Sequence, residues 1–295
     1  MRNGGLRTLP SVTQDARELR GREHSENFPV ALRLLPGGHR EALHAVYAFA
    51  RTVDELGDSF PGDRTSALRA FDADLDRIWS RPAAGPGPEH PVLRRLLPIV
   101  RDRGLPAEPF HRLVQANLQD QVVDRYPTFA DLLGYCRLSA DPVGRIVLGV
   151  FGVRDPEVER LSDRVCTALQ LLEHWQDVGE DRRAGRVYLP QEDLQAYAVD
   201  EAELDRREAS PALRSLMRFE VERAAGMLAE GVGIVDRLDG WARVSVAGFV
   251  AGGQATVAAL RRTGGDVLAR SASPSKSGTA ARAVRLLGHR KEGRR

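Results

Sequence analysis

Hydrophobic residues recur every three to four positions along most of this chain, which is the spacing that gathers them on one face of an α-helix. Pro and Gly punctuate residues 81–91, so this segment is predicted to be a loop. A helix break is predicted at 141–144, because Pro142 removes a backbone donor there. We see no convincing strand pairs, and the chain is predicted to be all-α in one domain. The predicted helices are 38–58, 92–103, 107–124, 129–152, 155–181, 201–207, 211–238, 241–263 and a short one at 280–287.

The predicted domain covers residues 23–265. Residues 1–22 combine Gly, Pro and scattered charge and are expected to be poorly ordered, whereas residues 266–295 are expected to form a basic, flexible tail. The stretch 244–260 carries no charge, yet it holds several glycines and few large apolar side chains. A membrane-spanning helix needs about 20 predominantly apolar residues. We therefore predict that this stretch is a buried helix with close backbone packing.

Charge is nearly balanced overall but unevenly distributed. The chain has 43 Lys and Arg against 41 Asp and Glu, a net charge of +2 that argues against a nucleic-acid-binding protein. The last 27 residues hold eight bases and one acid, which leaves an acidic body of 35 bases and 40 acids. Only Cys136 and Cys166 are present, and the N-terminus lacks the apolar core of a secretory signal. A cytoplasmic location is expected.

The first candidate site is a polar line along the helix predicted at 38–58. Asp54 and Asp58 are four residues apart, which places both carboxylates on one helix face. Arg51, Tyr47 and His44 extend the same line in steps of three and four residues. An isolated pair of this kind is usually part of a solvated surface.

The second candidate site is a matching line along the helix predicted at 155–181. Asp177 and Asp181 are again four residues apart, and Glu173 and Gln170 continue their line. Because apolar residues surround the rest of this helix, its acids are predicted to face a cavity.

The two lines together point to one kind of chemistry. If the two helices face each other, their four aspartates and Glu173 line one cleft, which needs cations to offset its charge. Carboxylate oxygens without His or Cys clusters suit Mg²⁺, which commonly bridges carboxylates to substrate phosphates. Basic residues close to both lines, including Arg51 and Arg186, would help to hold a diphosphate.

Four motifs in this order resemble the squalene/phytoene synthase family of trans-isoprenyl diphosphate synthases. They are HSENFPVALRLLP at 24–36, YAFARTVDELGD at 47–58, YCRLSADPVGRIVLGVFG at 135–152 and QLLEHWQDVGEDRRAGRVYLP at 170–190. The resemblance spans roughly residues 22–265 and implies a single-domain isoprenoid synthase fold, with helices packed around a central cavity. Within the family, the ENFPVA start and the block EHWQDVGEDRRAGRVYLPQEDL at 173–194 are most similar to the bacterial hydroxysqualene synthases of hopanoid synthesis.

The resemblance implies a role for each matched residue. Metal ligands would be Asp54, Asp58, Asp177 and Asp181, with Glu173 beside them. The diphosphate would be held by His24, Ser25, Arg51, Tyr135 and Arg186, and Arg51 and Tyr135 would join the aspartates as catalytic residues. The substrate cavity would include Tyr47, Val143, Gly144 and Gln170. Glu173 departs from the Asn that many members carry, and Gln254 and Thr256 lie where some members have a tyrosine.

The implied substrate in the hydroxysqualene branch is presqualene diphosphate. It would lose diphosphate with the help of Mg²⁺, rearrange and capture water, with no nicotinamide cofactor. Two alternatives are a head-to-head synthase acting on farnesyl or geranylgeranyl diphosphate and an inactive helical partner protein of the same fold. The basic tail is expected either to contact the anionic inner face of the cell membrane or to be a solvated, disordered segment.

Overall fold

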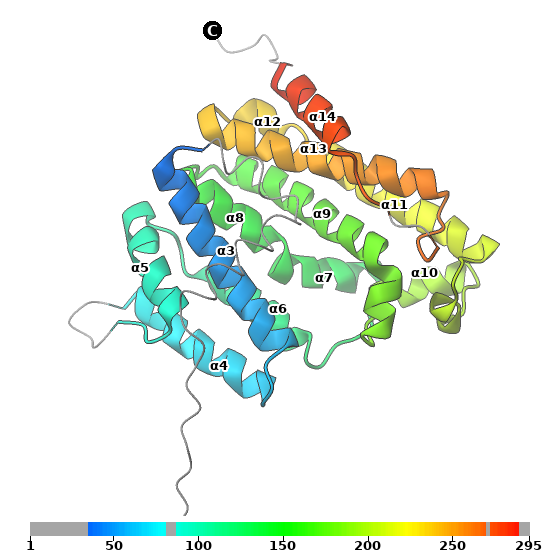
Figure 1. The fold of residues 1–295 in the computed structure, drawn as a ribbon, viewed down its shortest axis with the longest axis horizontal. Helices are drawn as coiled ribbons and strands as arrows, with labels where there is room; N and C mark the ends of the chain where they lie inside the picture. The colour runs from blue at the N-terminus through cyan, green and yellow to red at the C-terminus, as the bar shows by residue number, and fades with distance from the viewer. Residues whose placement is uncertain (1–34, 81–86, 270–271, 289–295) are drawn as a thin grey trace, which may run out of the picture.

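The chain folds into a set of packed helices in a computed structural model, which describes residues 35–80, 87–269 and 272–288 (Figure 1). The described residues form no β-strand, and their one β-bridge joins Arg125 and Val187. The prediction of an all-α fold is confirmed. The helices are α3 (Gly37–Asp58), α4 (Arg64–Leu75), η1 (Asp76–Ile78), α5 (Pro91–Arg103), α6 (Glu108–Gln119), α7 (Phe129–Ser139), α8 (Asp141–Val150), α9 (Pro156–Arg183), α10 (Gln191–Ala196), η3 (Glu201–Asp205), α11 (Pro211–Gly231), α12 (Ile234–Arg237), α13 (Gly240–Thr263) and α14 (Lys276–Gly288).

Two hydrophobic cores hold these helices together. One is centred on α9 and includes side chains of α7, α11 and α13, with Trp175 fully buried within it. The other includes side chains of α3 to α6, and Phe49 and Phe110 pack edge-on at its centre. Figure 1 shows α8 and α9 between the two groups of helices. Helix α8 contributes Leu148 to the first core and Val147 to the second, so it lies between them.

The start of α9 is specified locally. The side chain of Asp155 accepts a hydrogen bond from the backbone N–H of Glu157 at 2.9 Å, and Pro156 occupies the first turn. Both are strong signals for a helix N-terminus. From there α9 runs for 28 residues, and its apolar faces lie in the first core.

The predicted break between α7 and α8 is present. Helix α7 ends at Ser139, and α8 begins at Asp141 with Pro142 in its first turn. A side chain at Gly144 would place its Cβ 2.4 Å from Ser162 Oγ and 2.6 Å from Cys166 Sγ. The absence of a side chain therefore lets α8 lie close against α9.

The uncharged stretch 244–260 lies inside α13, as predicted, and is mostly buried. By length and composition α13 is the one helix among the described residues that could cross a membrane, with a mean hydropathy of 1.2. However, 61% of its most apolar window is buried within the protein, as in the core helix of a soluble domain. A Cβ on Gly253 would lie 2.6 Å from Leu169 Cδ2, which shows how closely α13 packs on α9.

Several predicted boundaries differ from the structure. The pattern predicted no helix between 59 and 80, yet α4 and η1 occupy most of it. The helix expected at 211–238 stops at Gly231, where a Cβ would lie 2.9 Å from the backbone oxygen of Leu161, and resumes as α12. Beyond the expected boundary at 265, Asp266 accepts hydrogen bonds from Ala209 N–H and from Arg214. These bonds, and the burial of Val267 and Ala272, place part of the expected tail in the packed domain.

Candidate active site

The acidic lines of α3 and α9 face the same cavity. Asp54 and Asp58 of α3 and Asp177 and Asp181 of α9 all line a chamber of about 370 Å³, which we call the polar chamber. Its lining also includes Glu173. The sequence could not show that these helices are neighbours, because 123 residues separate the two aspartate pairs. The structure thus brings together the carboxylates that the sequence predicted as one site.

Two polar side chains from other segments fix the α3 aspartates. Arg186, in the loop after α9, donates a hydrogen bond from Nη2 to Asp58 Oδ1 at 3.0 Å. Asn117 of α6 places its Nδ2 3.4 Å from Asp54 Oδ1. Burial by itself lowers the pKa of Arg186, but the neighbouring Tyr188, Asp120 and Asp58 raise it by more than burial lowers it. The net pKa is above its ordinary value, so the guanidinium keeps its charge. Arg186 therefore provides a cation beside the aspartates of the polar chamber.

Asp120 is a carboxylate of this chamber that sequence reasoning missed. It lies at the end of α6, and the hydroxyl of Tyr135 donates a hydrogen bond to its Oδ2 at 2.9 Å. Burial raises its pKa to about 6, and the charges of Asp58 and Asp54 add to this effect. The only sequence signal was its position three residues after Asn117, at the polar end of a predicted helix.

The donor set of the chamber fits a hard cation. Within the described residues no three His, Cys, Asp or Glu side chains are already clustered as a metal site. However, Asp120 Oδ1 is buried without a hydrogen-bond partner, and burial beside Asp181 and Glu180 raises the pKa of Asp177. Mg²⁺ usually takes one or two protein carboxylates together with water and substrate phosphates. Carboxylates contributed to one chamber by two helices suit such shared ligation better than a cage made of protein alone.

Aromatic rings form the inner wall of the polar chamber. His174 of α9 stacks on Tyr188 with ring centroids 3.6 Å apart. The rings of Tyr126 and Tyr135 also pack against Tyr188. Burial lowers the pKa of His174, although Asp181 nearby opposes that shift. The ring of His174 is buried in this stack.

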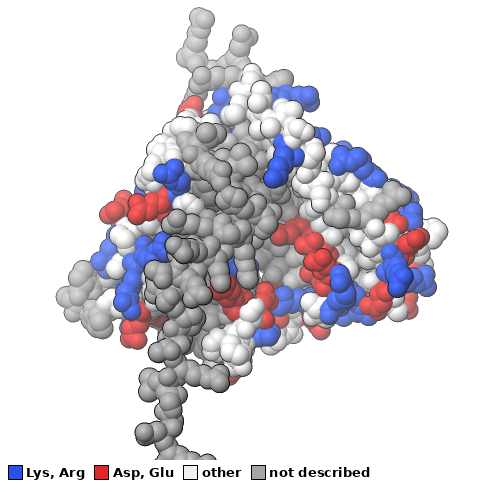
Figure 2. All heavy atoms as spheres, viewed as in Figure 1, with Lys and Arg blue, Asp and Glu red and all other residues white. Residues whose placement is uncertain are grey.

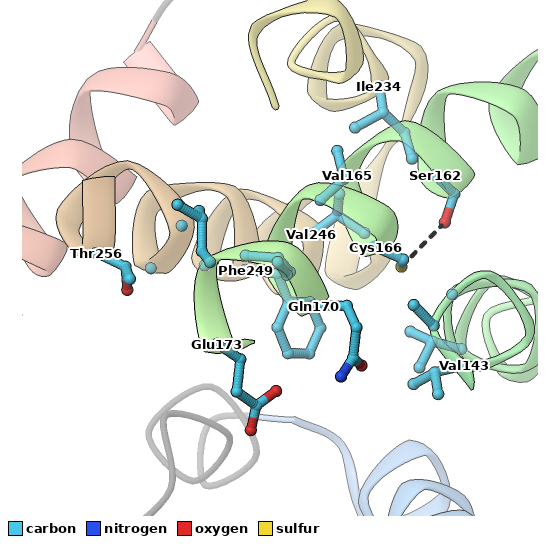
Figure 3. Close-up of a pocket in the computed structure, with 18 of the residues that line it drawn as sticks. Val143, Ser162, Val165, Cys166, Gln170, Glu173, Ile234, Val246, Phe249 and Thr256 are labelled. Atoms are coloured by element: carbon cyan, nitrogen blue, oxygen red, sulfur yellow. Dashed lines mark hydrogen bonds between the residues drawn. The ribbon is translucent and has the colours of Figure 1, made fainter. Parts of the chain in front are cut away.

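A second chamber of about 480 Å³ adjoins the first, and most of its lining is apolar (Figure 3). Val143 and Gly144 line it, as the motif implied. Figure 3 shows Val143 and Phe249 on either side of the side chain of Gln170. Four residues line both chambers and so mark their junction: Ser139, Val143, Gln170 and Glu173. A molecule with a charged end and a long apolar part could occupy both chambers at once.

Some predicted site residues do not line the polar chamber. Arg51 lies on α3, where its Nε is 3.4 Å from Oε1 of Glu55 one turn later, and it is not among the described residues that line the chamber. Tyr47, one turn before Arg51, is also absent from the chamber wall. His24 and Ser25 lie outside the described residues.

Comparison with known proteins agrees with this geometry. A family model described as squalene/phytoene synthase matches residues 21–278, which include all the residues that line the polar chamber. The hydroxysqualene synthase of Rhodopseudomonas palustris is 36% identical over 219 residues, which cover 73% of each chain. The 15-cis-phytoene synthase of Synechococcus elongatus is 30% identical over 235 residues, which cover 74% of each chain.

A solved structure shares both the fold and much of the sequence. The squalene synthase HpnC from Alicyclobacillus acidocaldarius is similar with a TM-score of 0.76 and 40% identity, over 85% of this chain and 93% of that chain. Helices packed around a central cavity, as the motifs implied, are thus the fold of this protein. The chain belongs to the squalene/phytoene synthase family, whose members are isoprenoid synthases.

Proposed function

We propose that this protein is a hydroxysqualene synthase, which converts presqualene diphosphate and water into hydroxysqualene and diphosphate. The observation that carries the proposal is the junction of a carboxylate-lined chamber with an apolar one. The diphosphate would lie in the first and the hydrocarbon in the second. Similarity to a named hydroxysqualene synthase at 36% identity supports this choice of substrate.

The residues of the polar chamber would bind the diphosphate and favour its departure. Asp54, Asp58, Asp177 and Asp181, with Glu173 close by, would hold Mg²⁺, which supplies positive charge to the leaving group. Arg186 would add a guanidinium on the same side, and Tyr135, whose hydroxyl donates its hydrogen bond to Asp120, would hold that carboxylate in place beside it. Fixed charge aimed at a leaving anion often lowers the barrier of such a reaction more than any other effect.

The apolar chamber would hold the hydrocarbon and restrict water. Its lining of Val143, Val147, Leu169, Val246 and Phe249 offers few groups that could react with a carbocation. Its volume falls within the range of about 300–1,000 Å³ that is typical of small-molecule sites. Water would therefore reach the cation only from the polar side of the junction.

A two-substrate product assay tests the proposal. Purified protein with Mg²⁺ is incubated with either presqualene diphosphate or farnesyl diphosphate, and the products are identified by mass spectrometry. We expect hydroxysqualene in the incubation with presqualene diphosphate and no C30 product in the incubation with farnesyl diphosphate. Conversion of farnesyl diphosphate alone into a C30 product would instead favour the head-to-head synthase, the alternative that similarity to a phytoene synthase supports.

The inactive partner protein is the remaining alternative. Against it stands the presence of all four motif aspartates on one chamber. Calorimetry with Mg²⁺ and inorganic diphosphate together should show binding to the purified protein, whereas an absence of both binding and turnover would favour the inactive protein.

We also propose that the C-terminal region contacts an anionic membrane from the cytoplasmic side. Helix α14 has no acid and carries Lys276, Arg282 and Arg285, and its Val284 is 71% exposed. Trp241, at the start of α13, is 39% exposed, and Arg243 nearby donates a hydrogen bond to the backbone oxygen of Leu287 at 3.1 Å. Figure 2 shows Lys and Arg, with little Asp or Glu, along the edge where α13 and α14 lie.

Vesicle sedimentation tests the membrane proposal. A double variant, Lys276→Gln with Val284→Asp, should bind vesicles rich in phosphatidylglycerol less than the unmodified protein, because it loses one basic and one apolar contact and gains an acid that the anionic surface repels. Vesicles of phosphatidylcholine serve as the control for charge. Equal sedimentation of both proteins with the anionic vesicles would overturn the proposal.

A further inference from the structure

His174 connects the metal side of the site with the substrate side along one face of α9. Its Nδ1 lies 3.8 Å from Asp181 Oδ2, and its Nε2 lies 3.2 Å from the Nε2 of Gln170. The ring is 7% exposed and stacked on Tyr188, so it has little freedom to rotate. His174 is therefore a fixed group between a carboxylate and an amide.

The tautomer of His174 sets the direction of the hydrogen bond to Gln170. A neutral imidazole has one N–H and one acceptor nitrogen, and a proton on Nδ1 faces the carboxylate of Asp181. Nε2 is then the acceptor, and the amide nitrogen of Gln170 donates to it. Because the amide nitrogen is held by the ring, the amide oxygen points away from His174.

Gln170 lies where the two chambers meet. It is one of the four residues shared by the two linings, and Figure 3 shows its side chain in the space between Val143 and Phe249. Of the other three, Val143 is apolar, Glu173 is charged, and the hydroxyl of Ser139 donates to the backbone oxygen of Tyr135 at 3.3 Å. Ser139 and Gln170 are thus the neutral polar groups at the junction whose oxygens can accept a hydrogen bond from water, and the amide of Gln170 is the one that Figure 3 shows between Val143 and Phe249.

We propose that Gln170, held in place by His174, orients the water molecule that captures the carbocation. This inference rests on the proposed function. The bond between carbon and the diphosphate oxygen breaks, and its electron pair leaves with the diphosphate. After rearrangement, an electron pair of the water oxygen forms the new C–O bond, and the departing diphosphate takes the released proton. Gln170 accepts a hydrogen bond from this water, and His174 is a positioning residue that acts through Gln170.

The site of capture follows from the two chambers. The carbon that loses diphosphate starts beside the polar chamber, whereas the rest of the hydrocarbon lies in the apolar one. Water that enters from the polar side therefore meets the cation at the junction. An acceptor at this point selects one direction of attack and keeps water from reaching the cation elsewhere.

The test is the ratio of products formed from presqualene diphosphate, measured together with the total release of diphosphate. Gln170→Leu removes the acceptor, and His174→Phe keeps a ring for Tyr188 but cannot hold the amide. Each should lower the share of hydroxysqualene among the products about five- to tenfold, which is what one hydrogen bond is worth, in favour of hydrocarbons or other alcohols. Because both act on one interaction, the double variant should shift the ratio no further than either single variant.

Two further variants separate positioning from structural damage. His174→Gln offers a carbonyl oxygen that can accept from the Gln170 amide and should restore most of the product ratio. Gln195→Leu makes the same substitution at an exposed position of α10 and should leave the ratio unchanged. Circular dichroism of each variant checks that the helices remain folded.

Failure of this inference differs from failure of the proposed function. If the unmodified protein forms no hydroxysqualene from presqualene diphosphate, the proposed function fails. If it forms hydroxysqualene and both Gln170→Leu and His174→Phe give the same product ratio at a lower rate, Gln170 does not orient the water. Additive shifts in the double variant would show that His174 does not act through Gln170.

Discussion

Replacement of Asp120 by Asn should stabilise the protein at neutral pH. Asp120 is buried beside the aspartates of α3, and burial raises its pKa from 3.8 to about 6. Its Oδ2 accepts the hydrogen bond from Tyr135, whereas its Oδ1 is buried without a partner. An asparagine keeps the acceptor for Tyr135, carries no charge, and turns a donor toward the acidic wall.

The magnitude follows from linkage between protonation and folding. The folded protein binds this proton more tightly than the unfolded chain, so ionisation of Asp120 costs folding free energy as the pH rises above 3.8, and the cost is complete above pH 6. One pKa unit corresponds to about 1.36 kcal/mol, which makes the full cost about 3 kcal/mol. At pH 4.5 the same relation leaves a cost of about 1 kcal/mol.

Urea denaturation at pH 7.5 and pH 4.5, in the presence of a chelator, measures both values. The free energy of unfolding of the Asp120→Asn protein should exceed that of the unmodified protein by up to about 3 kcal/mol at pH 7.5 and by about 1 kcal/mol at pH 4.5. Asp124→Asn is the matched control, because its side chain is 72% exposed and its loss should change stability by less than about 0.5 kcal/mol. An Asp120→Asn protein that gains nothing at pH 7.5, or gains equally at both pH values, would refute the reasoning.

Three further predictions address the site and its packing. Asp177→Ala should abolish turnover of presqualene diphosphate while its circular dichroism stays helical, and near-normal turnover would remove Asp177 from the metal site. Mg²⁺ with inorganic diphosphate should raise the melting temperature by several degrees, since binding at 100 times Kd adds about 2.7 kcal/mol, and Asp54→Asn should reduce this rise. Gly253→Ala should cost about 1–3 kcal/mol in urea unfolding, because the new Cβ would lie 2.6 Å from Leu169 Cδ2. Gly252→Ala is its control, with nothing within 4 Å of the new Cβ, and equal midpoints would contradict the close packing.

The helices and the two acidic lines could be predicted because both are local properties. A spacing of four residues puts Asp54 beside Asp58, and Asp177 beside Asp181, in any α-helix. The start of α9 and the break before α8 also follow from short-range signals, the latter at Pro142. The sequence missed α4 because its apolar residues form only a weak pattern among many charges.

By itself, the sequence determined most of the helices and which carboxylates share a helix face. Only the tertiary structure decided which faces meet. The pairing of Arg186 with Asp58 joins residues 128 positions apart, and the orphaned oxygen of Asp120 exists only because α6 ends against the chamber wall. Arg51 shows the converse, since it follows the predicted line on α3 but pairs with Glu55 on its own helix. Helical spacing fixes the direction of a side chain relative to its own axis, whereas the neighbours that it meets depend on how whole helices pack.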